Sequence, residues 1–228
     1  MFFDEDASCR LCIDADIGTL TTRNQFAKAY RLDIAVVPTL GPFEEDEEFL
    51  TEETYLRRWA NSRRRHRLFR NTWYRKGPEE FERFKQLVEE TWPGMSIKPP
   101  EISGYGPAYV VMFCEESRRD REIYWSGFGF QVWLQFLTRF LEAQDNSTMI
   151  IDEPDIYLHP DLQRRLFWLV RHRSTQSIMA THSIEIINEA DPDDLVVIDK
   201  TRRVGKRISD IAGMQEAVEN LGSTKTST

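Results

Sequence analysis

The fold of this chain is decided by the stretch Met149-Ile150-Ile151-Asp152-Glu153-Pro154. Its three apolar residues are typical of a short buried strand, and two adjacent carboxylates and a proline end it. Buried carboxylates are costly unless they are bound to a partner. A strand that runs into Asp-Glu therefore indicates a pair that holds Mg²⁺ and activates water, as in nucleotide hydrolases. A plain acidic turn at the end of a strand would give the same pattern.

Outward from this strand, strand and helix patterns alternate along the C-terminal half. Besides 148–152, we expect strands at 109–114, 177–180 and 195–199, and helices at 127–143, 161–171 and 183–190. A further β-branched strand, closed by proline, is expected at 32–38. This alternation favours an α/β fold with a mainly parallel sheet flanked by helices.

The region 44–100 has a different character and is expected to form a helical insertion. Seven of the ten residues from Glu44 to Glu53 are acidic, and nine residues from Tyr55 to Lys76 are Lys or Arg. An amphipathic helix follows at 79–92 and stops at a Pro-Gly pair. The expected outline is thus N-terminal strands at 1–43, the insertion at 44–100, the α/β lobe at 101–204, and a C-terminal helix with a polar tail at 205–228.

The composition sets limits on the class of protein. A chain of 228 residues suffices for one sizeable domain, or for a core with an insertion. The net charge of −8 disfavours a protein that coats nucleic acid generally. The acidic N-terminus and the lack of a long apolar run predict neither a signal peptide nor a membrane span, so we expect a cytoplasmic protein. Cys9 and Cys12 have the spacing of a zinc site, but no second Cys or His pair is near in sequence, which disfavours one.

A small-residue loop, Ser126-Gly127-Phe128-Gly129-Phe130-Gln131, opens the helix expected at 127–143. Free backbone N–H groups and the helix dipole make such a start a ready anion site, suitable for a phosphate. The alternative is a glycine-containing helix start without any ligand.

Two polar turns follow the decisive strand. Tyr157-Leu-His-Pro-Asp161 precedes the helix at 161–171, where Pro and Asp are also ordinary capping residues. Thr181-His182-Ser183 ends the strand at 177–180. Ligands of α/β sheets gather at the carboxyl ends of the strands. We therefore expect Asp152, Glu153 and His182 to converge on one crevice, although a histidine at a strand end is often only a structural hydrogen bonder.

Taken in order, these motifs resemble the C-terminal half of ABC-type ATPases. Ser126–Gln131 resembles the signature loop, with Phe128 between the usual adjacent glycines, and Met149–Glu153 resembles Walker B. Tyr157–Asp161 resembles the D-loop region, and His182 matches the switch histidine. The subgroup with the strongest resemblance is the OLD-like and SMC-like AAA ATPases of bacteria, which include phage-defence proteins.

The resemblance implies ATP and Mg²⁺ as cofactors and assigns roles to the motif residues. Asp152 would hold Mg²⁺, Glu153 would act as the general base, and His182 would contact the γ-phosphate. The signature loop would bind the nucleotide of the opposite subunit in a head-to-tail dimer, through Ser126, Gly127, Gly129 and Gln131. A second ATPase subunit, an effector protein and DNA or RNA are the implied partners, and no membrane is implied.

The sequence departs from this family in one important respect, because no Gly-x-x-x-x-Gly-Lys-Ser/Thr phosphate loop is present. In the family this loop would fall before Met1. The chain is therefore interpreted as a fragment or truncated reading frame of a longer ATPase. Alternatively, a partner supplies the loop, or the chain is a pseudo-ATPase. Each alternative predicts that the chain alone hydrolyses ATP slowly or not at all.

A module that binds nucleic acid or a partner protein is the hypothesis from another class. Its basis is the cationic segment Arg57–Lys76, in which Trp59, Phe69, Trp73 and Tyr74 are interleaved. The competing interpretation is a solvated helix face that the acidic block at 44–53 neutralises.

Overall fold

The computed structural model of this protein describes residues 2–3, 9–10, 34–58, 67–104, 108–173, 175–199 and 204–222. Its helices are α2 (Glu52–Arg58), α3 (Phe69–Tyr74), α4 (Pro78–Thr91), α5 (Phe128–Glu142), α6 (Pro160–Arg171), α7 (Ile184–Glu189) and α8 (Ile211–Gly222), with 3₁₀ turns η2 (Ile123–Trp125) and η3 (Pro192–Asp194). Its strands are β1 (Phe2–Phe3), β2 (Cys9–Arg10), β3 (Ile34–Val37), β4 (Met95–Ile97), β5 (Glu101–Ser103), β6 (Tyr109–Val111), β7 (Phe113–Glu116), β8 (Arg119–Glu122), β9 (Thr148–Asp152), β10 (Gln176–Ala180), β11 (Val196–Asp199) and β12 (Val204–Arg207).

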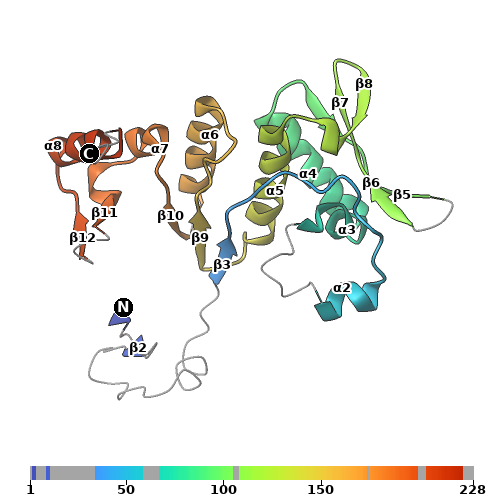
Figure 1. Ribbon diagram of the computed structural model, residues 1–228, viewed down its shortest axis with the longest axis horizontal. Coiled ribbons are helices and arrows are strands. Elements are labelled where there is room, and N and C mark those ends of the chain that lie inside the picture. The colour runs from blue at the N-terminus through green and yellow to red at the C-terminus, as the bar shows by residue number, and fades with distance from the viewer. Residues whose placement is uncertain are drawn as a thin grey trace, which may run out of the picture.

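The centre of the fold is a parallel sheet in which β9 lies between β10 and β3 (Figure 1). Asp152 at the end of β9 is opposite Ala180 at the end of β10, so the two strands finish level with each other. Helices α5 and α6 precede and follow β9 along the chain. The α/β fold with a parallel sheet and flanking helices, which the sequence predicts, is confirmed.

One face of this sheet carries the hydrophobic core. Met149 and Ile151 of β9 are fully buried, together with Val37 of β3. They belong to one cluster with Leu137 of α5 and Leu166 of α6. Because side chains alternate between the two faces of a strand, every second residue of β9 packs against these helices.

The opposite face of the same sheet is open. Val36, Ile150 and Ile178 are register partners, so their side chains form one row across the three strands. Val36 is 59% exposed and Ile178 is 50% exposed. Parallel sheets are normally covered on both faces. A row of β-branched residues in water thus marks a face that a further element would cover.

Alanine substitutions on the two faces are expected to have unequal effects. Ile151→Ala leaves a cavity in the core and should lower the free energy of unfolding by about 2–5 kcal/mol. Ile178→Ala removes a half-exposed side chain, and its effect should stay below about 1 kcal/mol. Urea unfolding of the purified chain measures both. Equal losses would show that the Ile178 face is covered in solution.

The region expected as a helical insertion is joined firmly to the sheet domain. Trp73 of α3 and Phe84 of α4 stack with ring centroids 4.0 Å apart. The Trp73 indole N–H donates to Thr138 Oγ1 of α5 at 2.8 Å, and the Trp133 indole N–H of α5 donates to Thr91 Oγ1 of α4 at 3.0 Å. These contacts place α3, α4 and α5 in one continuous core.

Strand pairing differs from the sequence-based outline in four places. β4 pairs with β7, so pairing crosses the boundary expected between 100 and 101. The strand expected at 109–114 is divided into β6 and β7, which lie in separate antiparallel sheets. A hairpin turn with positive φ at Ser117 and Arg118 joins β7 to β8, and its lack of glycine or asparagine concealed it in the sequence. The strand expected at 195–199 forms β11, which pairs antiparallel with β12.

Two smaller sequence-based expectations concern the membrane and the cysteine pair Cys9 and Cys12, and the structure adds a finding on Cys114. Among the described helices, none combines the length and the apolar character needed to cross a bilayer. Cys9 lies in β2, paired with β1, whereas Cys12 lies outside the described residues. Burial raises the pKa of the Cys114 thiol to about 11, so this thiol stays protonated at neutral pH and is a poor nucleophile.

Candidate active site

Glu153 and His182 meet at the carboxyl edge of the parallel sheet. The Glu153 N–H donates to the carbonyl oxygen of Ala180 at 2.9 Å and extends the pairing of β9 and β10 by one residue. The His182 Nε2 atom lies 3.3 Å from Glu153 Oε1. Asp152 is the last residue of β9 and is exposed at this edge. The structure therefore brings together the three residues that the sequence placed in one crevice.

The backbone at Glu153 is in the left-handed region, with φ of +47°. This conformation costs a residue other than glycine about 1 kcal/mol or more, and such strain is concentrated at functional sites. It turns the chain sharply at the point where β9 ends. A second positive φ, +67° at Tyr157, lies in the turn that follows.

The third strand of the sheet also contributes to the edge. Thr39, two residues after β3, places its Oγ1 atom 3.4 Å from Asp152 Oδ2. We did not single out Thr39 from the sequence, although its position just after the strand expected at 32–38 was a usable signal.

The donor set at this edge fits a magnesium ion that arrives with a nucleotide. No group of three or more His, Cys, Asp or Glu within the described ranges is arranged to hold a metal. Mg²⁺ is usually bound by one or two carboxylates, with phosphate oxygens and water as the other ligands. Asp152 supplies such a carboxylate, and the Thr39 hydroxyl lies beside it.

Hydrogen bonds fix the turn that carries His182. The Thr181 hydroxyl donates to Asp155 Oδ1 and accepts from the Ser183 N–H at 2.9 Å. The Ser183 hydroxyl donates to Gln163 Oε1, and the Gln163 amide donates to the carbonyl oxygen of Leu158 at 2.8 Å. Gln163, which the sequence gave no reason to select, thus ties the Leu-His-Pro turn to the Thr-His-Ser turn.

Two side chains of the signature loop are turned inward. Ser126 is 7% exposed and its hydroxyl donates to the carbonyl oxygen of Ile123. Gln131 is fully buried, and its amide donates to the carbonyl oxygens of Tyr124 at 2.7 Å and Ser126 at 2.9 Å. Its Oε1 atom accepts from the Phe43 N–H at 2.8 Å. Gln131 therefore shapes the loop from behind.

The two glycines of the loop have different surroundings. Gly127 is the N-cap of α5, and a side chain there would meet open space. A Cβ atom on Gly129 would lie 2.9 Å from the carbonyl oxygen of Tyr157, a distance that real Cβ atoms do not show. The signature loop is thus packed against the turn that follows Glu153, and the Phe128 and Tyr157 rings meet edge to face at 5.8 Å.

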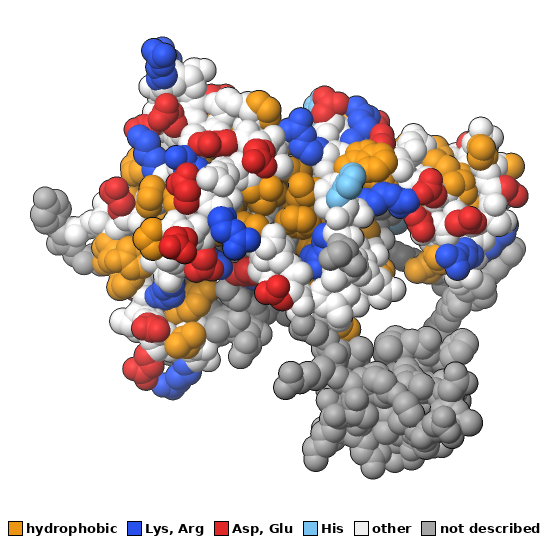
Figure 2. All heavy atoms as spheres, turned by 180° about the vertical axis from the view of Figure 1, so that it is seen from behind, with side chains coloured by type: hydrophobic (Ala, Val, Ile, Leu, Met, Phe, Trp, Pro, Cys, Tyr) orange, Lys and Arg blue, Asp and Glu red, His pale blue; other side chains and the backbone are white. Residues whose placement is uncertain are grey.

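Several described residues of the basic segment 57–76 are buried and do not form part of a cationic surface. Arg70 is 1% exposed and pairs with Glu122 and Glu47. Phe69 and Trp73, expected as candidate stacking residues, are 2% exposed core residues. Arg63–Arg65 lie outside the described residues. Figure 2 shows acidic and basic side chains intermixed over the face that it presents. For Arg70, Phe69 and Trp73 the nucleic-acid interpretation was wrong.

Comparison with known proteins identifies a family for most of the chain. Residues 26–188 match the family model described as "AAA domain, putative AbiEii toxin, Type IV TA system". No curated protein sequence matches the chain.

Three solved structures of SMC proteins are similar to part of this chain. A structure from a study of ATP-driven dimerization and DNA-stimulated activation of SMC ATPases has 14% identity and a TM-score of 0.49, and the alignment covers 63% of this chain and 91% of that chain. An Smc head with an extended coiled coil, bound to the C-terminal domain of ScpA from Pyrococcus furiosus, has 11% identity and a TM-score of 0.41. The alignment covers 62% of this chain and 37% of that chain. An Smc head bound to the C-winged helix domain of ScpA has 16% identity and a TM-score of 0.43. The alignment covers 65% of this chain and 46% of that chain. This chain thus spans less than half of the length of the last two.

Proposed function

Because this chain belongs to the AAA domain family whose model it matches over residues 26–188, we propose that it provides half of an ABC-type ATP-hydrolysing site. The observation that carries the proposal is the meeting of Glu153 and His182, 3.3 Å apart, beside Asp152 at the carboxyl edge of a parallel sheet. Ligands of α/β folds bind at this edge.

The proposed chemistry follows from the positions of three side chains. Mg²⁺, when bound, would neutralise charge on the phosphate oxygens, and Asp152 would hold it with help from Thr39. Glu153 would orient and polarise the attacking water as general base. His182, whose ring is largely exposed and contacts Glu153 through Nε2, would contact the γ-phosphate and link its presence to the position of the base.

The signature loop would serve a second ATPase subunit in a head-to-tail dimer. The loop adjoins exposed aromatic residues, with Trp125 at 67%, Phe128 at 53% and Tyr157 at 53%. Exposed apolar patches of this kind mark interaction surfaces. The backbone of Gly127 and Gly129 would contact the partner's nucleotide, with Ser126 and Gln131 holding the loop in shape.

The phosphate loop would come from a strand–loop–helix segment that packs against the open face of the sheet. Such a segment would cover the row of Val36, Ile150 and Ile178, in which Val36 and Ile178 are exposed and Ile150 is partly buried. A strand added parallel to the sheet would end at the same edge as Glu153 and His182. The helix after it would begin there, which is where an anion binds.

The resemblance to OLD-like ATPases suggests what hydrolysis would control. We propose that the assembly couples ATP to a nucleic-acid-directed or defence effector in the cytoplasm. The alternative is a pseudo-ATPase, in which the signature face of this chain binds a nucleotide held by a partner and no hydrolysis occurs at Glu153.

A substitution at the helix start tests the role of the signature loop. Gly127→Asp fits open space and suits an N-cap, so the fold should be retained, but its carboxylate would repel a phosphate. We expect ATP-dependent self-association to be lost in the native assembly, measured by sedimentation velocity. Gly77→Asp is the matched control, because Gly77 is also an N-cap in open space. Association of the Gly127→Asp assembly at wild-type ATP concentrations would contradict the dimer.

A further inference from the structure

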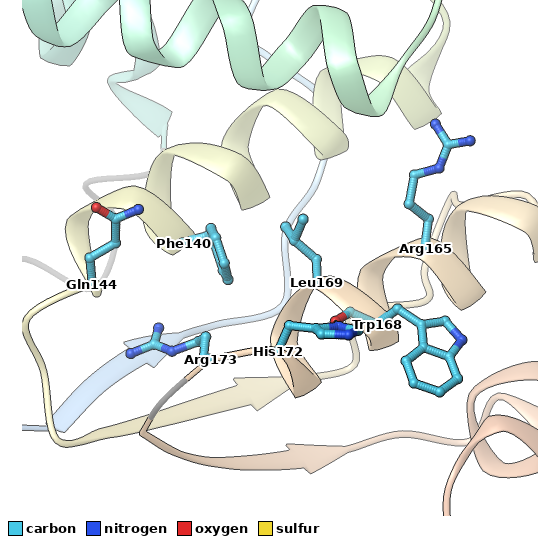
Figure 3. Close-up of a pocket in the computed structure, with 7 residues that line it drawn as sticks. All are labelled: Phe140, Gln144, Arg165, Trp168, Leu169, His172 and Arg173. Atoms are coloured by element: carbon cyan, nitrogen blue, oxygen red, sulfur yellow. The ribbon is translucent and has the colours of Figure 1, made fainter.

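A cavity of about 640 Å³ lies between the C-terminal half of α5 and α6 (Figure 3). Its lining residues are Phe140, Gln144, Arg165, Trp168, Leu169, His172 and Arg173. The volume is within the range of small-ligand sites. Because α6 starts just after the carboxyl edge of β9 and runs back, its last turn lies toward the other edge of the sheet, away from Glu153.

The cationic residues of this cavity lack the counter-ions that neighbouring arginines have. No carboxylate is among the lining residues, and neither Arg165 nor Arg173 forms an ion pair with any described residue. On the same helix, Arg164 pairs with Asp161 and Glu185, and Arg171 pairs with Asp191 and Asp194. In a chain of net charge −8, two guanidinium groups without carboxylate partners at one cavity are unusual.

Arg173 is held in place by neutral acceptors. Its guanidinium donates to the carbonyl oxygen of Ala143 at 2.7 Å and to Thr175 Oγ1 at 2.9 Å, and it contacts Met149 Sδ at 2.9 Å. Partial burial lowers its pKa, and no neighbouring charge acts in the opposite direction. A fixed cation of this kind favours a bound anion, and guanidinium geometry suits phosphate oxygens.

Aromatic rings form the rest of the surface. Trp168 is 44% exposed, and its indole N–H donates to Glu189 Oε2 at 2.7 Å, which fixes the ring. The Phe140 ring centroid is 5.8 Å from the guanidinium carbon of Arg173. Figure 3 shows Phe140, Leu169 and Arg173 facing the space between the two helices. Flat rings beside guanidinium groups form the kind of surface that binds a base and its phosphate together.

We propose that this cavity binds a nucleoside phosphate, with the base against the Phe140 ring and the phosphate at Arg173. Arg165 lies at the other end of the lining, where its guanidinium donates to the carbonyl oxygen of Thr91. The ligand is either a free nucleotide or one unit of a single-stranded nucleic acid. The site is separate from Asp152, Glu153 and His182, so it does not depend on the proposed ATPase function.

The test is a binding titration of the full chain with AMP and with a fluorescent oligothymidylate, in EDTA so that magnesium-dependent binding is suppressed. Gln144→Glu adds a carboxylate to the lining and can keep the bond in which Gln144 Oε1 accepts from Arg83 at 3.2 Å. We expect it to weaken binding about 10-fold, and Arg173→Gln to weaken it at least as much. Asn188→Asp on α7 adds the same charge elsewhere, and Arg171→Gln removes a paired arginine; both should change binding less than about twofold.

Each outcome of the titration decides the proposal. Saturable AMP binding that Gln144→Glu weakens supports a free-nucleotide site. Binding of the oligonucleotide alone, with the same dependence and a salt-sensitive affinity, supports a nucleic-acid strand. Absence of binding by both probes overturns the proposal, as does binding that Gln144→Glu and Arg173→Gln leave unchanged. Because Asp152→Asn and Glu153→Gln should not affect this binding, failure here would leave the proposed ATPase function intact.

Discussion

The substitution Glu153→Gln is expected to lower ATP turnover of the native assembly by about 10²–10⁴-fold, the usual contribution of a general base. The amide has nearly the shape of the carboxylate, and the Glu153 N–H bond to Ala180 is unaffected. Loss of rate would therefore report loss of the base. The assembly is the chain with the subunits that co-purify under native conditions, and turnover is measured as phosphate release.

Two controls sharpen this measurement. Glu189→Gln removes a carboxylate that bonds only to Trp168 among the described contacts, and it should leave turnover unchanged. The isolated chain should show little ATP turnover, whether position 153 is Glu or Gln. Turnover by the isolated chain that Glu153→Gln abolishes would sink the view that another segment must complete the site. Unchanged turnover of the Glu153→Gln assembly would favour the pseudo-ATPase.

The edge of the sheet could be predicted from sequence because its causes are local. The apolar run 149–151 and the run before Thr181 each specify a strand, and parallel strands place their carboxyl ends together. The meeting of Glu153 with His182 follows from that geometry alone. The contribution of Thr39 did not follow, because it depends on β3 pairing with β9 across more than one hundred residues.

The signature loop shows where sequence reasoning stops. Its residue types predict an anion site at a helix start, but they do not reveal which side chains face inward. Gln131 is buried, and its side-chain amide accepts from the Phe43 N–H of another segment and donates to the carbonyl oxygens of Tyr124 and Ser126. The role of Gln131 in nucleotide binding stays a proposal. In that proposal Gln131 acts indirectly, because it holds the loop in shape.

The charged blocks at 44–53 and 55–76 form both local and long-range ion pairs. The expectation that they would neutralise each other is met at two described pairs, Glu47 with Arg70 and Glu44 with Arg67. The main partner of Arg70, however, is Glu122, which is 52 residues away. No periodicity or local composition encodes that contact, so the sequence alone leaves a cationic surface and a neutralised ion pair as alternatives for Arg70.

Removal of this buried arginine should be among the most destabilising single changes in the chain. The Arg70 guanidinium donates to both oxygens of Glu122, at 2.8 and 3.0 Å, and to the carbonyl oxygen of Glu44 at 3.1 Å. Glu47, which is 4% exposed, lies 3.6 Å from the same group. Arg70→Ala leaves Glu47 buried without a cation, which costs about 3–5 kcal/mol of unfolding free energy in urea. Arg67→Ala removes an exposed ion pair in which Arg67 lies 3.9 Å from Glu44, and it should lower the free energy of unfolding by at most about 0.5 kcal/mol.

The pH dependence of this loss identifies its cause. Burial raises the pKa of Glu47, and the charge of Arg70 opposes that rise. A raised carboxyl pKa gives stability that is present below the unfolded-state value and is lost as pH rises through the folded-state value. Without Arg70 the pKa rises further, so the deficit should be larger at about pH 8 than at about pH 5. Adding Glu47→Gln to Arg70→Ala should recover part of the loss at about pH 8, because the unpaired charge is gone. A deficit that is independent of pH, with no recovery in the double variant, would assign the loss to packing and to Glu122 alone.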